Sequence, residues 1–289
     1  MQFFDSCNKA ITSCIESQSY SIAHLLSSEH TMDMHIHDCC EVYYSISGGK
    51  KFLINNQLYS FEPGDIFFIN CNEGHHLLQV EAEKHERYVI NIHPEFITKH
   101  SSPQTDLSFC FNGVERPSGH MLSLTPKEQQ RFLFLMHKLS SLDPADFGAD
   151  ITEHLTFLEL MIFFNELFSS RRYSLEKPAV LEKHYKKTNE IITYINQNLS
   201  GELNLSILSK QFSVSTSHLN RIFKEETGTT LQKYIVAQRV ALAKTLLSDG
   251  HTVTEAFSLS GFGDYSNFYK TFTKMVGMSP KNYAINSAK

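Results

Sequence analysis

Two stretches of the chain, 217-SHLNRIFKEETGTTLQKY-234 and 266-SNFYKTFTKMVGMSPKNY-283, are versions of one pattern. The second copy follows the first at an offset of 49 residues, the interval that separates Phe223 from Phe272 and Gly228 from Gly277. The same shift aligns Ser217 with Ser266, Leu219 with Phe268, Arg221 with Lys270, Thr230 with Ser279, and Tyr234 with Tyr283. Similarity at a fixed interval indicates a duplicated supersecondary unit.

Each copy follows a short predicted helix and a tight turn. The short helices are "LSILSKQF" and "VTEAFSLS", and the turns are "SVS" and "GFG". A short helix, a three- or four-residue turn and a second helix of about eleven residues form a helix-turn-helix unit. The segment between the two units, residues 231–249, contains neither Gly nor Pro, which predicts a rigid helical spacer.

The apolar spacing gives the phase of both second helices. Leu219, Ile222 and Phe223 define the buried side of the first, and Phe268 and Phe272 that of the second. The opposite sides then present Ser217, Arg221 and Lys224 with His218 and Asn220 beside them, and Ser266, Lys270 and Thr273 with Tyr265 and Asn267 beside them. Cationic, amide and hydroxyl side chains on such a helix suit base edges and phosphates in the DNA major groove.

Charge is divided along the chain in a way that fits this prediction. Residues 184–289 carry 12 Lys and Arg against 7 Asp and Glu, whereas the rest carries 14 against 24. A basic C-terminal third is expected to face a polyanion. If both second helices enter successive major grooves on one side of a duplex, they lie about 34 Å apart.

The N-terminal half has a different pattern. Between Ile36 and Ile92, short β-branched and aromatic runs alternate with turn signals such as Gly48-Gly49 and Pro63-Gly64, which predicts an antiparallel sandwich or barrel. Thr125, Pro126 and Glu128 then mark the start of a helix. Two helices, about 126–141 and 146–170, are apolar around most of their circumference. We expect them to pack on the barrel and on a second copy of the chain, with wholly intramolecular burial as the alternative.

Composition limits the class of protein. The 289 residues are 41% hydrophobic and 20% charged, as in ordinary globular domains, and the length suggests two of them. No apolar run reaches the roughly 18 residues of a membrane span, and the start lacks a signal-peptide layout, so we expect a cytoplasmic protein without a membrane partner. Six cysteines are then expected to be reduced thiols, although the adjacent Cys39 and Cys40 leave a thiol-based redox regulator as an alternative.

The C-terminal pattern resembles a known family. "GFGDYSNFYKTFTKMVGMSPKNY" is similar to the signature of AraC-family transcription regulators, and "HLNRIFKEETGTTLQKYIVAQRVALAKTLL" to their first helix-turn-helix. The resemblance spans roughly residues 185–286 and implies a seven-helix DNA-binding domain. Its DNA-facing positions fall here on Ser217, His218, Asn220, Arg221, Lys224, Tyr265, Ser266, Asn267 and Lys270. Thr273 stands where the family commonly has Lys, which implies a missing phosphate contact.

The stretch "HIHDCCEVYYSISGG", residues 35–49, carries the second candidate site. In a strand, residues of equal parity share a face, so His35, His37, Cys39, Glu41, Tyr43 and Ser45 line one side and Ile36, Val42, Tyr44 and Ile46 the other. The order of His35, His37, Glu41 and Gly48, with "PGDIFFINCNEGH" ending in His75, resembles the two cupin motifs. Glu29, Asn70 and Asn72 depart from them.

The cupin resemblance implies that His35, His37, Glu41 and His75 point into the barrel. Three histidines and a carboxylate suit Fe(II), Mn(II), Ni(II) or Zn(II). We favour instead a small-molecule effector pocket that adds Tyr43 and Arg87, whose polar groups suit a polyhydroxylated ligand such as a sugar. A divalent metal at the four residues and a polar lining without ligand remain alternatives, and no resident cofactor is expected.

The predicted architecture is therefore a multidomain α and β chain. A cupin-like effector-binding and dimerisation domain covers residues 1–170, with the barrel at about 20–100 and the dimerisation helices at about 126–170. A linker covers 171–183, and an all-α domain with two helix-turn-helix units covers 184–289. We expect a non-enzymatic, homodimeric DNA-binding regulator under effector control, which contacts RNA polymerase if it is an activator; the sequence leaves activator and repressor both open. The alternative from another class is a metal-dependent cupin enzyme with an appended DNA-binding module.

Overall fold

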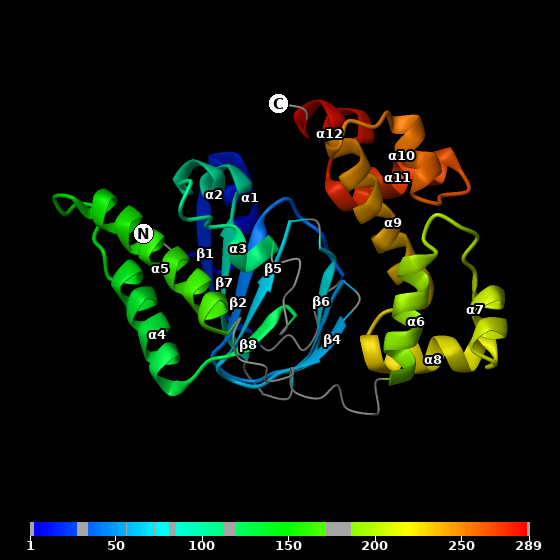
Figure 1. The fold of residues 1–289 in the computed structure, drawn as a ribbon, viewed down its shortest axis with the longest axis horizontal. Coiled ribbons are helices and arrows are strands. Elements are labelled where there is room, and N and C mark those ends of the chain that lie inside the picture. Colours follow the sequence, from blue (N-terminus) through cyan, green and yellow to red (C-terminus); the bar gives the residue numbers. More distant parts are fainter. Residues whose placement is uncertain are drawn as a thin grey trace.

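A computed structural model describes residues 3–27, 34–55, 57–71, 73–80, 85–112, 119–171 and 186–287. Figure 1 shows two bodies side by side, one built around β-sheets and one made only of helices. The predicted linker, 171–183, lies outside the described residues except for Arg171, the last residue of its helix.

In the described residues, the N-terminal body has eight strands in two antiparallel sheets. The order in one sheet is β1-β7-β2-β5-β8 and in the other β4-β3-β6. The strands are β1 (Tyr20–Ser27), β2 (Cys40–Ser45), β3 (Lys50–Ile54), β4 (Gln57–Ser60), β5 (Asp65–Ile69), β6 (His75–Val80), β7 (His85–Ile92) and β8 (Met121–Ser123). The predicted barrel is confirmed, and β8 extends it beyond the expected end near residue 100.

The two faces of β2 separate as strand parity predicts. Val42 and Tyr44 belong to the core beneath the helices, where the Tyr44 ring lies 4.5 Å from that of Phe132. Tyr43 belongs to the barrel interior with Phe52 and Phe67. Both faces are buried because helices cover the outside of the sheet.

Helices accompany the strands, among them α1 (Cys7–Ser17), α2 (Pro94–His100), α3 (Phe109–Asn112), α4 (Pro126–Ser140) and α5 (Ala149–Arg171). Helix α4 begins as the sequence predicts, since Thr125 and Glu128 form a reciprocal capping box. Helices α4 and α5 bury Phe132, Leu135, Phe157, Phe164 and other apolar residues against the five-stranded sheet.

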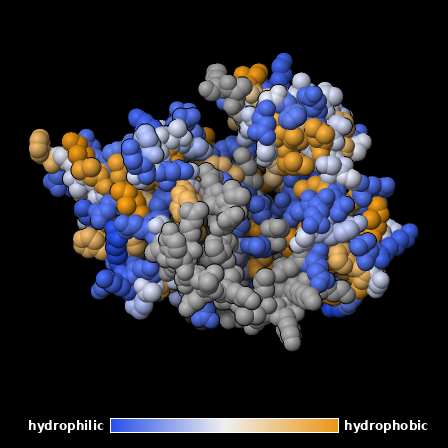
Figure 2. Space-filling view, in the orientation of Figure 1, coloured by the Kyte–Doolittle hydropathy of each residue, from blue (hydrophilic) through white to orange (hydrophobic). Residues whose placement is uncertain are grey.

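The same two helices also expose apolar side chains. On α5, Ile151 is 62% exposed and Leu155 60%, and on α4, Phe134 is 63% exposed. Figure 2 shows hydrophobic atoms along the edge of the molecule where Figure 1 places these helices. The prediction that these helices have apolar surface on more than one side is confirmed.

The C-terminal body consists of α6 (Lys186–Gln197), α7 (Leu205–Gln211), α8 (Thr216–Thr227), α9 (Leu231–Ser248), α10 (Val253–Leu259), α11 (Tyr265–Val276) and α12 (Pro280–Ser287). The pairs α7–α8 and α10–α11 are the two predicted helix-turn-helix units, and α9 joins them. None of the helices that the structure describes is long and apolar enough to span a membrane.

The helical body packs on the three-stranded sheet, on the side opposite α4 and α5 (Figure 1). One apolar cluster joins Leu53, Leu58 and Leu78 of that sheet to residues of α6, α8 and α9, among them Ile191, Phe223 and Tyr234. The Tyr234 hydroxyl donates a hydrogen bond to the Asn55 carbonyl at 2.7 Å. The two bodies therefore share an interface that contains both apolar and polar contacts.

Candidate DNA-binding surface and sensor site

Helices α8 and α11 are capped in the same way. Their N-caps, Ser215 and Asp264, each accept a hydrogen bond from the backbone N–H three residues ahead. Their C-caps, Gly228 and Gly277, have φ of 67° and 82°, the left-handed conformation that favours glycine. The caps fix where each helix starts and stops, so equivalent side chains of the two copies have the same phase.

The buried sides of both helices are as predicted. Leu219 and Phe223 on α8 and Phe268 and Phe272 on α11 are buried, whereas Ile222 is half-buried. Most of the predicted DNA-facing side chains are exposed: Ser217, His218, Arg221, Lys224, Tyr265, Ser266, Asn267 and Lys270. The structure thus gathers a cation, a hydroxyl and further polar groups on the outer side of each second helix.

Arg221 already has partners on its own helix. Its guanidinium lies 3.0 Å from a Glu225 carboxylate oxygen and 3.1 Å from His218 Nδ1. Both members of the Arg221–Glu225 pair are more than half exposed. Such surface pairs contribute about 0–1 kcal/mol, so the guanidinium can exchange Glu225 for a base or phosphate at little cost.

Asn220 is placed differently from the other predicted residues. It is half-buried, and its side-chain oxygen accepts a hydrogen bond from the Leu231 backbone N–H at 3.2 Å. This bond caps the start of α9. Because the amide oxygen is engaged there, Asn220 holds α8 against α9 rather than presenting its full amide outward.

On α11, Thr273 and Tyr265 differ in how far their side chains reach the solvent. The predicted outward orientation of Thr273 is wrong, because the residue is half-buried and its hydroxyl oxygen is fully enclosed. The threonine turns its short side chain into the helix packing, unlike exposed Lys224 at the equivalent position of α8. Tyr265 is 45% exposed, and its ring packs edge-on against Phe257 at 5.4 Å, which fixes its direction.

The sensor candidate is a tight group of four side chains at one end of the barrel interior. The ligand-type atoms of His35, His37, Glu41 and His75 all lie within 4.8 Å of one another. His35 and His75 exchange two backbone hydrogen bonds of 3.1 Å, which brings the two chain segments together. The Glu41 carboxylate lies 3.1 Å from His37 Nε2 and 3.6 Å from His75 Nε2.

Backbone contacts orient two of the histidine rings. His37 Nδ1 lies 3.0 Å from the Cys39 carbonyl and His75 Nδ1 lies 2.9 Å from the Glu73 carbonyl. A carbonyl accepts only, so each Nδ1 carries the proton and each Nε2 faces the group. Metal-binding histidines are commonly oriented through their other ring nitrogen in this way.

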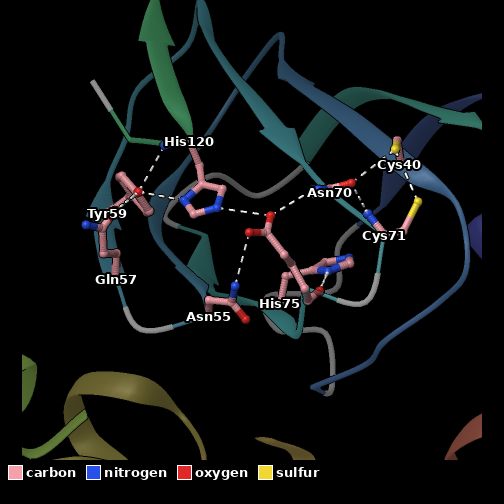
Figure 3. A network of polar contacts seen from close by, with 9 residues as sticks. Cys40, Asn55, Gln57, Tyr59, Asn70, Cys71, His75 and His120 are labelled. Atoms are coloured by element: carbon pink, nitrogen blue, oxygen red, sulfur yellow. Dashed lines mark hydrogen bonds and ion pairs between the residues drawn. The ribbon is translucent and has the colours of Figure 1, made fainter. Parts of the chain in front are cut away.

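Glu73 also anchors the turn from which His75 projects. Its carboxylate contacts Asn55, Asn70 and His120, three of the residues labelled in Figure 3. The distances are 3.1 Å from Asn55 Nδ2, 2.7 Å from the Asn70 backbone nitrogen and 3.0 Å from His120 Nε2. Asn55 directly follows β3 and His120 directly precedes β8, strands of different sheets, so Glu73 ties the His75 segment to both sheets.

The electrostatics of the group are those of an internal ion pair. Burial alone would raise the pKa of the Glu41 carboxyl, but His75 and His37 outweigh it and hold that pKa well below its usual range. Burial opposes the charge on His75, and Glu41 raises the pKa of that imidazole above its usual value. The four side chains thus form a site that already stabilises positive charge beside Glu41.

Sequence reasoning missed Asn91, which belongs to the same site. It lies directly opposite Glu41 in the β2–β7 register, and paired residues share a face of the sheet. The side chain is fully buried, and neither its oxygen nor its nitrogen has a hydrogen-bond partner among the described residues. An orphaned amide in this place indicates that a ligand or an ordered water completes the site.

The structure separates the other two predicted effector residues from this group. The Tyr43 ring is packed among Phe52, Phe61 and Phe67, and its hydroxyl lies 2.8 Å from His85 Nε2. Arg87 lies opposite Ser45 and contacts His85 at 3.4 Å. At about 3.3 Å per residue, Ser45 is roughly 13 Å along the strand from Glu41.

The donor set fits a metal ion. Ligand atoms bound to one transition-metal ion lie about 2.0–2.2 Å from it, hence roughly 3–4 Å from each other. Imidazole with carboxylate suits a divalent first-row ion of the zinc or iron type. Atoms within 4.8 Å of one another need only a small contraction to close on an ion, whereas a sugar ring does not fit between them.

The cysteines do not form the adjacent pair that the redox alternative needs. Cys40 Sγ lies 3.2 Å from Cys71 Sγ, whereas Cys39 pairs with Cys14. Hydrogen bonding to Cys14 and burial raise the pKa of the Cys39 thiol, and hydrogen bonding to Cys40 and burial raise that of Cys71. Thiols with raised pKa are poor nucleophiles, which disfavours a reactive sensor here.

Two family models match the two bodies separately. Residues 23–156 match the family model of an AraC-like ligand binding domain, and residues 208–285 match a helix-turn-helix domain model. The HTH-type transcriptional activator RhaR of Enterobacter sp. (strain 638) is 25% identical over 270 residues, 88% of each chain. RhaS of Salmonella arizonae is 26% identical over 250 residues, 86% of each chain. ToxT from Vibrio cholerae aligns structurally over 92% of this chain and 98% of its own, at 14% identity and a TM-score of 0.37.

Proposed function

The chain belongs to the AraC family of transcriptional regulators, and from this premise we propose that it is a dimeric activator that recruits RNA polymerase to DNA in the cytoplasm. Its C-terminal domain binds DNA and its N-terminal domain binds an effector. The relatives are named transcriptional activators, which agrees with the prediction that the protein is not an enzyme. The proposed division is a sensor and dimerisation domain at 1–170, a linker at 171–183 and a DNA-binding domain at 184–289.

One observation carries the DNA-binding proposal. Helices α8 and α11 have matching caps and matching buried faces, and each turns a cation, Arg221 or Lys270, to the outside. Helix α9 joins the two units with 18 residues, about 27 Å at ~1.5 Å per residue. That length suits two second helices that enter successive major grooves, which are about 34 Å apart.

Selection of bound duplexes from a random pool tests this proposal. The full chain should enrich a motif with two half-sites one helical turn apart. Its binding constant should fall steeply as salt rises, because several phosphates are neutralised. The double variant Arg221→Ala, Lys270→Ala should enrich nothing, whereas Lys233→Ala, on exposed α9 surface, should leave the motif unchanged. A full chain that binds no duplex at low salt would refute the proposal.

Dimer formation is supported by the exposed apolar row on α5. Ile151, Leu155 and Ile162 recur at intervals of four and seven residues, the spacing of one helix face, and all three are exposed. A second copy of the chain would remove this row from water. Two copies would also place two DNA-binding domains on one operator.

For the effector, the geometry favours a divalent transition-metal ion over the sugar proposed from the sequence. His35, His37, Glu41 and His75 would hold the ion, and Asn91 would hydrogen-bond to a water on it. Bound there, such an ion would act as a charged signal. Calorimetric titration with Zn²⁺, Mn²⁺ and common hexoses separates the two classes. Binding of zinc or manganese that His75→Ala abolishes supports the ion, and binding of a sugar alone supports the carbohydrate.

A further inference from the structure

The segments that carry the four-residue site also touch the DNA-binding domain. Asp38, directly after His37, lies 2.7 Å from Lys244 Nζ on α9. It also accepts a hydrogen bond of 3.0 Å from the Tyr283 hydroxyl on α12. We call these three side chains the Asp38 clamp. It joins residues about two hundred positions apart in sequence, and it lies one residue from the sensor site.

Lys244 makes the clamp energetically important. Its side chain is 1% exposed, whereas that of Asp38 is 34% exposed. A buried ammonium without a counter-charge is strongly destabilising, so the docked arrangement depends on the Asp38 carboxylate. Lys244 also lies 5.4 Å from the centre of the Tyr283 ring, which adds a cation–π contact.

The backbone links Asp38 tightly to the site. Asp38 lies between His37 and Glu41, two of the four site residues, and the His37 ring binds the Cys39 carbonyl on its far side. Any shift of the His37 ring on ligand binding therefore acts on the peptide segment that presents Asp38.

The second ligand-bearing segment contacts the same domain. The Asn55 backbone nitrogen donates to the Gly74 carbonyl at 2.7 Å, and the Asn55 carbonyl receives the Tyr234 hydroxyl. Gly74 directly precedes His75, and at Gly74 an added Cβ would lie 3.5 Å from Gln238 Nε2 on α9. Both chain segments that carry the four site residues are thus linked directly to the interface between the two domains.

We propose that occupancy of the His35, His37, Glu41 and His75 site by a divalent cation weakens the docking of the DNA-binding domain through the Asp38 clamp. This inference rests on the proposed regulator function and on the metal interpretation of its site. The sign follows from charge, since a dication adds positive charge at His37, next in sequence to Asp38, whose carboxylate is the counter-charge of the buried Lys244 ammonium. Contraction of the four ligands onto the ion also shifts the His37 segment, which presents Asp38 to Lys244.

Linkage turns the proposal into a binding measurement. If the ion opposes docking, loss of the docked state must strengthen ion binding by the same factor. Zn²⁺ titration of the full chain by calorimetry should show Asp38→Asn binding zinc at least about fivefold more tightly than the wild type. Lys244→Met stays docked but removes the ammonium charge that opposes the ion, so it should also bind zinc more tightly, and it does so from the other domain. Lys233→Met, on exposed α9 surface, should match the wild type.

Small-angle scattering of the same proteins separates the two variants. The wild type should be compact without zinc and expand on adding it. Asp38→Asn should be expanded throughout, because Lys244 loses its counter-charge. Lys244→Met should stay compact with or without zinc, because a methionine fills the buried position without charge, and such apolar replacements are often neutral or stabilising.

Equal zinc affinity in the wild type and Asp38→Asn, or a wild-type radius of gyration that zinc leaves unchanged, would overturn the proposal. Absence of zinc binding by the wild type would overturn it too. Duplex binding is measured separately. A chain that binds its operator but fails these tests refutes the clamp alone, whereas a chain that passes them without binding DNA refutes the regulator function.

Discussion

At the level of single side chains, Arg221 gives the sharpest test of DNA reading. We expect Arg221→Ala to cost about 1–3 kcal/mol on the selected operator and to relax specificity at one base pair, because an arginine fork reads guanine. Glu225→Gln should strengthen binding by at most about 1 kcal/mol, since it removes a competing surface partner. Competition assays on operator and random duplexes measure both. If Arg221→Ala lowered the affinity for both duplexes equally, Arg221 would contact a phosphate instead of a base.

The buried side chain of His85 is expected to make the free energy of unfolding depend on pH. Burial, and then the nearby Arg87, lower the pKa of His85 to about 4. A histidine whose folded pKa is depressed contributes fully above its unfolded pKa of about 6.5 and loses that contribution as pH falls toward about 4. The loss amounts to roughly 3 kcal/mol, at 1.36 kcal/mol per pKa unit.

Denaturant unfolding at pH 7 and near pH 4.5 measures this contribution. The wild type should lose more unfolding free energy between the two conditions than His85→Gln, whose amide can still bond to the Tyr43 hydroxyl but does not titrate. Identical losses in the two proteins would show that His85 is protonated without penalty.

Among the helices, the two equivalent glycines offer a matched comparison. An alanine at Gly228 or Gly277 must adopt a left-handed conformation, which costs about 1–2 kcal/mol in either place. An added Cβ at Gly228 would also collide with Leu78 Cδ2 and lie 2.9 Å from His76 Nε2, whereas at Gly277 nothing lies within 4 Å. Both variants should therefore unfold more easily, but only Gly228→Ala should separate the domains. Small-angle scattering distinguishes them, and equal expansion would place the interface elsewhere.

The same helices show what sequence can and cannot predict. The phase of α8 and α11 was predictable because capping and apolar spacing act within one helix, as the buried Phe223 and Phe272 show. The role of Asn220 was not, since its partner, the Leu231 backbone nitrogen, starts the next helix and only the packed structure brings the two together. The predicted outward orientation of Thr273 was wrong for a related reason. A short side chain on the helix flank can turn inward, where a lysine must reach solvent.

Within the sensor body, strand parity predicted the grouping of Glu41 with Tyr43 on the interior face. It did not predict which interior residues meet. His35, His37 and His75 join Glu41 because a backbone bridge aligns His35 with His75, and Tyr43 is isolated by phenylalanines from β3 and β5. Asn91 gave no sequence signal, since a single asparagine in an apolar strand is informative only when its opposite residue is known.

For the whole molecule, the charge division and the repeat predicted two bodies with different tasks. Their interface could not be predicted, because Asp38, Lys244 and Tyr283 are ordinary polar residues until folding brings them together. That interface leaves the exposed faces of α4 and α5 on the opposite side of the sensor body (Figure 1). The proposed dimer surface and the domain interface are therefore separate and can be perturbed separately.

This separation yields a prediction about the assembled dimer. Leu155→Glu places a charge in the exposed apolar row of α5 and should convert the dimer to a monomer in sedimentation equilibrium. Affinity for an operator with two dimer-related sites should then fall by about 10²–10⁴, the usual gain from linking two binding modules, while affinity for one isolated site stays the same. Thr98→Glu, an equal charge change on exposed α2 surface, should remain dimeric. A Leu155→Glu dimer with wild-type operator affinity would mean that the chain associates through another face.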